Sequence, residues 1–105
     1  MTGSASDNDC DYPLTIVEGE AAPALQAIRE QPGPLANSVE SALERIRNLA
    51  FPPSFFFRAV TWGEAGHSGY ISRANEGRSD ETVIIWEFVG ANCTIVLHYV
   101  GPAYP

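Results

Sequence analysis

The chain has 105 residues, of which 45% are hydrophobic, and a formal net charge of −7 from thirteen acids and six arginines, with no lysine. This length allows one domain with one core, and this composition excludes a chain that is disordered throughout. The longest apolar run falls far short of the roughly 20 residues of a membrane-spanning helix, and the shortage of clustered cations argues against direct binding of nucleic acid. Because residues 1–12 contain no apolar segment of the signal-peptide kind, we expect a cytoplasmic protein that does not bind membranes.

The first residues differ in composition from the rest of the chain. Residues 1–12 are polar and acidic, and we interpret them as a disordered leader before a single α+β domain at residues 13–105. The two cysteines, Cys10 in the leader and Cys93 in the domain, give no disulfide framework, so we expect them to be reduced. No histidine and cysteine pair has the close spacing of a structural zinc site. The sequence therefore predicts no metal and no other cofactor.

A short strand and two helices are expected first. Residues 14–17 have the β-branched character of a strand. Residues 20–31 carry apolar residues at helical spacing, and Pro23 falls in the first turn, where no backbone donor is lost. In the second helix, Asn37 is expected to cap the N-terminus while Glu40 reaches back in a capping box. The longer apolar stripe of the second helix makes it the main helix of the fold.

The rest of the chain is expected to form strands. Residues 55–62 are dense in aromatic side chains, and residues 70–74 form another short strand after a glycine-rich loop. Residues 82–89 and 93–100 are two apolar runs around a three-residue loop, which is typical of a β-hairpin. This order predicts an α+β fold, a β-α-α-β-β-β chain with one further strand as an option, in which a small antiparallel sheet packs on two helices.

Alternation of side chains along the hairpin predicts which residues share a face. One face is expected to hold Ile84, Trp86, Phe88, Ile95, Leu97 and Tyr99. The opposite face is expected to hold Val96 and Val100, interrupted by Glu87 and His98. Because two short helices cover one face of a sheet, the other face needs loops, a protein partner or a second copy. We therefore predict a homodimer or a hetero-complex, with His98 and Trp86 close to the contact.

Arginine and histidine are the candidates for chemistry. Arg58 and Arg73 would form an anion site if they converge on one sheet face, because guanidinium groups match phosphate and carboxylate; otherwise they serve as partners of the many acids. His98 interrupts an apolar strand with an imidazole, the side chain that most often moves protons in enzymes. It is either a proton shuttle or a half-exposed histidine that is hydrogen-bonded to its surroundings.

The order of elements, together with the apolar hairpin 83–88 and 94–101, resembles the RelE/ParE superfamily of bacterial toxins from toxin–antitoxin pairs. The likeness spans residues 14–104. Some members of the superfamily cut messenger RNA in the ribosome, and others poison DNA gyrase. In an RNA-cleaving site, the resemblance implies that arginines neutralise the scissile phosphate and that a histidine or tyrosine moves a proton. The candidates at matching positions are Arg58, Arg73, His98 and Tyr104.

Three functions are compatible with these features. Because a net charge of −7 fits a ribosomal RNA groove poorly, we favour a toxin-like component of a toxin–antitoxin pair that acts mainly by binding proteins. Its partner would be an antitoxin, with DNA gyrase as a candidate target. A small adaptor or immunity-type binding domain without toxicity is the first alternative. A ribosome-dependent mRNA endoribonuclease is the second.

Overall fold

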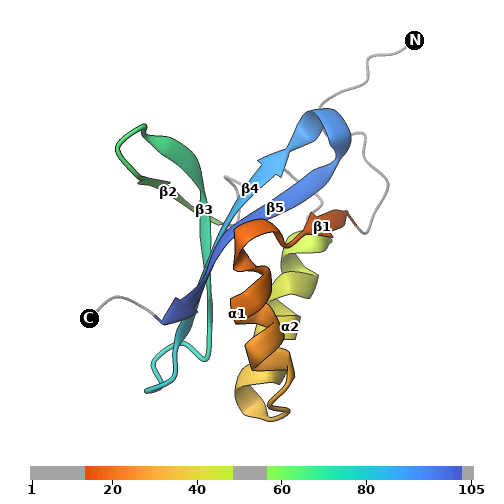
Figure 1. Cartoon of the computed structure of the whole chain (residues 1–105), viewed down its shortest axis with the longest axis vertical. Helices are drawn as coiled ribbons and strands as arrows, with labels where there is room; N and C mark the ends of the chain where they lie inside the picture. Colours follow the sequence, from red (N-terminus) through yellow and green to blue (C-terminus); the bar gives the residue numbers. More distant parts are fainter. Residues whose placement is uncertain (1–13, 49–56, 103–105) are drawn as a thin grey trace.

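The computed structural model describes residues 14–48 and 57–102. Its elements are, in order, β1 (Thr15–Val17), the 3-10 turn η1 (Gly19–Ala21), α1 (Ala22–Arg29), α2 (Pro34–Arg47), β2 (Arg58–Trp62), β3 (His67–Ala74), β4 (Thr82–Val89), the 3-10 turn η3 (Gly90–Asn92) and β5 (Thr94–Pro102) (Figure 1). The predicted α+β class is confirmed. The expected leader at residues 1–12, and with it Cys10, lies outside the described residues.

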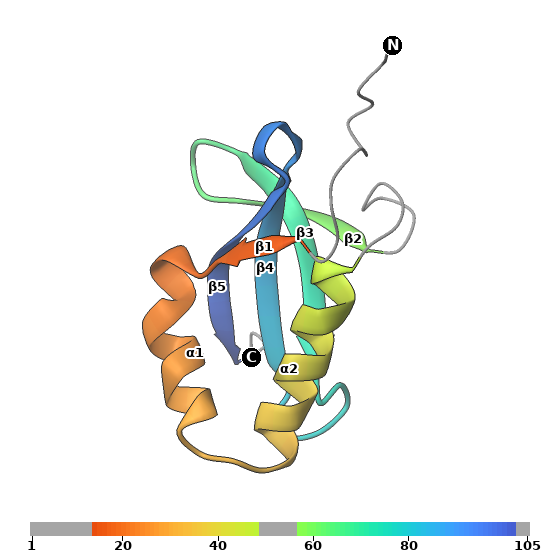
Figure 2. The same cartoon turned by 90° about the vertical axis from the view of Figure 1, so that its right-hand side faces the viewer.

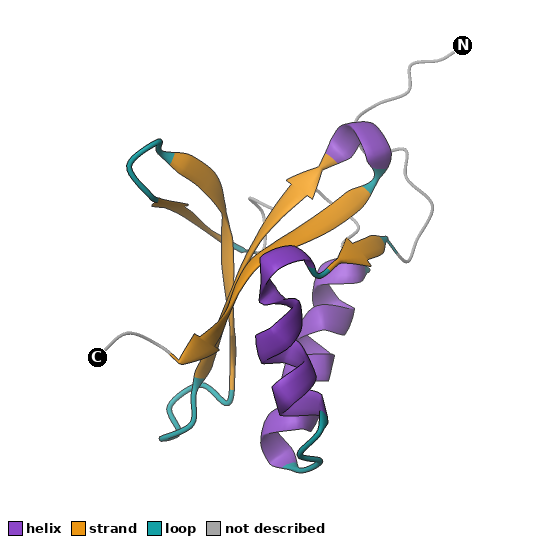
Figure 3. Cartoon of the chain, viewed as in Figure 1, coloured by secondary structure: helices purple, strands orange, loops and turns teal. Residues whose placement is uncertain are grey.

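All five strands belong to one sheet with the order β1-β5-β4-β3-β2. The four strands β2 to β5 are antiparallel neighbours, whereas β1 pairs parallel to β5 with Ile16 opposite Ile95. The four antiparallel strands are as expected, and the parallel edge strand β1 makes the sheet mixed. Both helices pack on one face of the sheet, as Figures 2 and 3 show. We call this side the helix face and the opposite side the open face.

The core lies between the helices and the helix face. Its buried side chains include Leu25 of α1, the stripe of α2, and the inward residues of β4 and β5. Trp86 at its centre is fully buried, donates its indole N–H to Ser72 Oγ at 3.1 Å, and meets the Phe57 ring edge-on at 4.9 Å. None of the described helices is long and apolar enough to cross a membrane.

Helix α2 begins earlier than the sequence predicts. Pro34 occupies its first turn, where the missing N–H removes no helical hydrogen bond. Asn37 lies inside the helix and no side-chain hydrogen bond caps the N-terminus, so the expected capping box is wrong. Glu40 instead accepts a hydrogen bond from Arg29. The placement of Pro23 in the first turn of α1 is confirmed.

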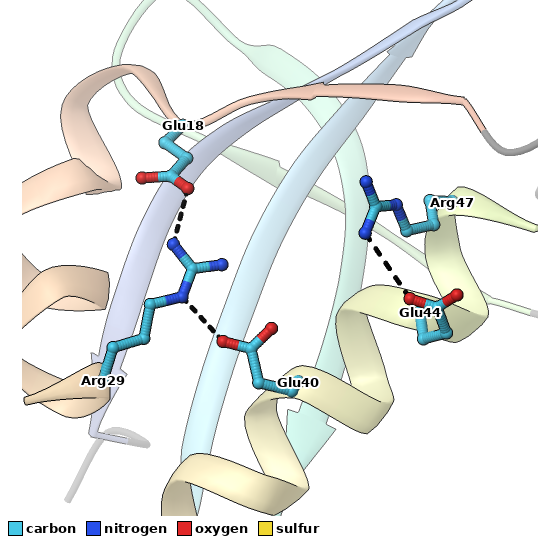
Figure 4. Close-up of polar contacts among 5 residues, drawn as sticks. All are labelled: Glu18, Arg29, Glu40, Glu44 and Arg47. Atoms are coloured by element: carbon cyan, nitrogen blue, oxygen red, sulfur yellow. Dashed lines mark hydrogen bonds and ion pairs between the residues drawn. The ribbon is translucent and has the colours of Figure 1, made fainter. Parts of the chain in front are cut away.

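Arg29 links the elements on the helix face. Its Nε donates to Glu40 Oε2 at 2.6 Å and its Nη1 donates to Glu18 Oε2 at 2.7 Å (Figure 4). These two carboxylates, Glu40 more than Glu18, raise the pKa of Arg29 further above its ordinary value. Because Glu18 follows β1 and Glu40 lies on α2, one guanidinium fork on α1 connects three elements.

A β-bulge in β5 changes the expected faces of the hairpin. The pairing passes from Ile85 opposite Tyr99 directly to Trp86 opposite Leu97, so His98 is the extra residue on β5. A bulge adds one residue to one strand only, and the side chains beyond it therefore exchange faces.

The consequences are visible on both faces. Val100 turns to the helix face, where it lies opposite Ile84 and is only 3% exposed. Tyr99 turns to the open face. The expectations that Tyr99 shares a face with Leu97, and that Val100 faces away from the core, are therefore wrong. The residues whose predicted common face is confirmed are Ile84, Trp86, Phe88, Ile95 and Leu97.

Candidate binding surface on the open face of the sheet

The sheet divides into two hairpins toward one end. β3 begins at His67, earlier than expected, but it pairs with β4 only as far as Tyr70 opposite Trp86. Beyond that pair the β2–β3 hairpin and the β4–β5 hairpin diverge, which Figure 1 shows as a fork. The open face is therefore curved.

An apolar groove of about 300 Å³ lies on the open face. All four antiparallel strands contribute to it. Its lining residues are Val60, Thr61, Trp62, Ile71, Arg73, Val83, Ile85, Tyr99 and Pro102. This volume lies at the lower end of the range for small-ligand sites. Its tryptophan, tyrosine and arginine are the residue types that most often dominate the energy of protein–protein contacts.

Trp62 spans the open face from one hairpin to the other. It passes over Gly69 of β3, where a Cβ would lie 3.1 Å from the indole ring and would clash with the carbonyl oxygen of Trp86. Its ring centroid lies 5.8 Å from that of His67, its cross-strand neighbour, and 5.0 Å from that of His98 on β5. The absence of a side chain at position 69 therefore allows the indole to connect β2 with β5.

His98 forms a polar pair on the same face. Its Nε2 lies 3.1 Å from Glu87 Oε1 on β4, and the two side chains are 29% and 46% exposed. This geometry fits a half-exposed histidine that is hydrogen-bonded to its surroundings. Its use as a proton shuttle stays a prediction.

Tyr99 is the site residue that sequence reasoning placed on the wrong face. Its ring lies over Gly101, where a Cβ would be 2.8 Å from Cζ, and its hydroxyl donates to the carbonyl oxygen of Pro102 at 3.1 Å. These contacts hold the ring along the wall of the groove. The glycine two positions after the tyrosine is the one sequence signal for this packing, because it leaves room for a ring on that face.

Arg58 and Arg73 lie near one cavity, and the anion site that they were predicted to form stays a prediction. Both line a pocket of about 270 Å³, and α2 contributes Arg45 to the same pocket. Arg73 also donates from Nη1 to Glu81 Oε2 at 2.7 Å, so it has an acidic partner. Arg58 forms no ion pair with a described residue. Sequence reasoning missed Arg45, because a helix position gives no signal of which strand it packs near.

The four residues implied by the toxin resemblance are not all placed together. Arg58 and Arg73 share the 270 Å³ pocket, whereas His98 lies against Trp62 and Glu87. The fourth, Tyr104, lies outside the described residues. Their joint action on a phosphate stays a prediction.

The open face is less exposed than expected. Among the described residues, Val17 on β1 is the one large hydrophobic side chain that is exposed, at 45%. Side chains of the groove, such as Val83 and Ile85, are buried or half-buried by their neighbours. Trp86 has no exposed area and belongs to the helix face, so its predicted place close to a partner contact is wrong. Trp62, which is half-buried, lies on the open face beside His98.

Two further observations concern cysteine and metal binding. Cys93 is disulfide-bonded, so the expectation of a reduced cysteine is wrong for this residue. The described residues hold no group of three or more histidine, cysteine, aspartate or glutamate side chains that could bind a metal ion.

No family model matches the chain, and comparison with curated proteins and with solved structures finds no match. The α+β architecture, with two helices before four of the five strands of a mixed sheet, is what the structure establishes.

Proposed function

We propose that this chain is a toxin-like component of a toxin–antitoxin pair and that it acts by binding proteins through its open face. The observation that carries the proposal is the groove on that face, with Trp62, Tyr99 and Arg73 in its lining. A groove of this size accepts one or two side chains of a partner. Two helices between the first strand and an antiparallel sheet support membership of the RelE/ParE superfamily, whose antitoxins cover their toxins.

The chemistry of the groove favours one kind of occupant. An apolar side chain of the partner would fill the space beside Trp62 and Tyr99, and an acidic neighbour would meet Arg73. A second copy of the chain is a poorer occupant, because two molecules of net charge −7 repel each other. We therefore commit to a partner protein and treat the homodimer as an outcome that the experiment distinguishes.

The alternatives differ in location and chemistry. An adaptor or immunity-type domain would use the same groove without toxicity. The endoribonuclease is not favoured, because His98 pairs with Glu87 and lies apart from the arginine pocket. The cytoplasmic location is part of the proposal, and the disulfide at Cys93 is the observation against it, since such bonds persist mainly in oxidising compartments.

The product of the neighbouring open reading frame is the first partner to test. We expect a complex by light scattering and a change in tryptophan emission that arises from Trp62, because Trp86 is already buried. Trp62→Ala should weaken binding about tenfold or more, while Val17→Ala, which changes an exposed residue of β1, should leave it unchanged. Equal affinity of the two variants would remove the groove from the proposal. A homodimer without this partner would point to the second copy.

Induced expression in a bacterium tests toxicity. We expect growth to stop and to resume when the neighbouring gene is expressed as well. Trp62→Ala should be less toxic than the unaltered chain, because its indole lines the groove through which the chain is proposed to act. Unchanged growth, combined with a stable complex in the binding experiment, would replace the toxin by the adaptor.

A further inference from the structure

Half of the arginines in this acidic chain line one pocket. The chain has six arginines, and Arg45, Arg58 and Arg73 lie around the cavity of about 270 Å³ between α2 and the edge of the sheet. Three different elements supply them, which are α2, β2 and β3. The chain as a whole is acidic, with a net charge of −7. The three arginines around this cavity are therefore a local feature of the surface.

The structure holds two of these guanidinium groups in place without neutralising the pocket. Arg45 Cζ lies 5.8 Å from the centroid of the Phe57 ring, which positions the cation without adding a negative charge. Arg73 is held by one hydrogen bond from Nη1 to Glu81 and keeps its other donors. Arg58 has no acidic partner among the described residues.

We propose that this pocket binds a phosphate monoester. Its described lining contains three arginines and one acid, Glu76, and Glu81 pairs with Arg73 from outside the lining, so these side chains leave a local charge of about +1 before a ligand binds. A phosphate monoester carries close to −2 at pH 7 and offers three acceptor oxygens, enough for one hydrogen bond from each arginine. A carboxylate has one negative charge and two oxygens, and it would leave one guanidinium without a partner.

The shape of the cavity indicates a small organic group on the phosphate. A volume of about 270 Å³ lies just below the usual range for ligand sites, so the whole ligand is small. Phe57, Ile71 and Ala42 form the apolar part of the lining. Among the described residues, the pairing of β2 with β3 ends at Arg58 opposite Ile71, and the cavity lies next to this end of β2. The site shares Ile71 and Arg73 with the groove, but it does not depend on the proposed function.

Calorimetric titration of the purified chain tests the site with phenyl phosphate, inorganic phosphate and benzoate at constant ionic strength. We expect saturable binding of phenyl phosphate, weaker binding of inorganic phosphate and none of benzoate. Arg45→Gln and Arg58→Gln should each weaken phenyl phosphate about tenfold. Arg78→Gln removes the same charge at an exposed turn outside this pocket and should change nothing. Circular dichroism confirms that each variant is folded.

A phosphoserine peptide distinguishes the two sources of such an ester. Tighter binding of phenyl phosphate than of the peptide assigns the site to a small molecule, and the reverse order assigns it to a phosphorylated protein. Absence of saturable binding by both would overturn the proposal. Binding that is equally strong in Arg45→Gln, Arg58→Gln and Arg78→Gln would place the anion elsewhere on the chain and would also overturn it.

Discussion

The two faces of the sheet shield their apolar side chains from water in different ways. On the helix face, α1 and α2 pack against the apolar side chains, and Trp86, Ile84 and Ile95 have no exposed area. On the open face no described helix lies over the strands, and the side chains shield one another, with Trp62 lying across Gly69 and Tyr99 across Gly101. The first arrangement provides stability. The second leaves a groove that a ligand can enter, at some loss of buried area.

The largest expected effect is on the free energy of unfolding, when one tryptophan from each face is replaced. Trp86→Ala should lower the free energy of unfolding by about 4 kcal/mol, because it opens a cavity among fully buried neighbours and leaves Ser72 without its indole donor. Trp62→Ala should cost only about 1 kcal/mol, since the half-buried indole has solvent on one side. Urea unfolding measures both. Similar losses for the two variants would mean that the faces do not differ in the way described.

A methyl group at Gly69 tests how the open face shields itself. Gly69→Ala should destabilise by about 2 kcal/mol, because the new Cβ meets the backbone carbonyl of Trp86 and the ring of Trp62. Ser68→Ala, at the exposed neighbouring position, is the matched control and should be nearly neutral. Thermal unfolding gives the stabilities, and the emission of Trp62 reports its displacement. An unchanged spectrum in Gly69→Ala would contradict the position of the indole over β3.

The helix face has one polar connection at its surface. Arg29→Gln should destabilise by about 1 kcal/mol, because it removes two partly exposed ion pairs, to Glu40 and Glu18. High salt should reduce the difference from the unaltered chain, since these charges are screened. Gln26→Ala, on the same helix and also exposed, is the control. A loss that is independent of salt would point to packing of the arginine stem instead.

The smallest effect concerns the acid that anchors Arg73. The backbone N–H of Gly77, and after it the guanidinium of Arg73, lower the pKa of Glu81 from its ordinary 4.5. A lowered folded-state pKa stabilises the fold at neutral pH, and this contribution is lost as the pH falls through that pKa. Glu81→Gln should therefore be slightly less stable than the unaltered chain at pH about 7, and the difference should vanish well below the ordinary value. Urea unfolding at both pH values measures this, and a constant difference would exclude the ion pair as its cause.

The comparison of the two faces also shows which structural features could be predicted from the sequence. The alternation around Ile84 and Trp86 predicts the helix face, because strand periodicity and burial agree there. The face of Tyr99 could not be predicted, because a bulge depends on the register of two strands. The sequence around His98 contains no signal that this residue is the extra one. The predicted cap at Asn37 is wrong because α2 begins one turn earlier, at Pro34.

The candidate sites were harder to predict than the fold, because their members meet only in three dimensions. Arg58 and Arg73 are within reach of sequence reasoning, since neighbouring strands bring them to one region. Arg45 joins them from α2, and the sequence contains no sign of that contact. Trp62 depends on Gly69, a pairing that becomes apparent only when the register of β2 and β3 is known.

The parallel pairing of β1 with β5 has a consequence for the synthesis of the protein. Thr15 pairs with Thr94 and Val17 with Val96, so the first strand acquires its only neighbour in the described sheet after residues 18–93 have been translated. Until then the apolar sides of α1 and α2 lack the β5 residues that complete their core. Contacts of such long sequence separation are slow to form, because the intervening chain loses entropy before they close. Folding on the ribosome therefore cannot be completed stepwise, and a nascent chain that ends before β5 should be an open substrate for chaperones and proteases.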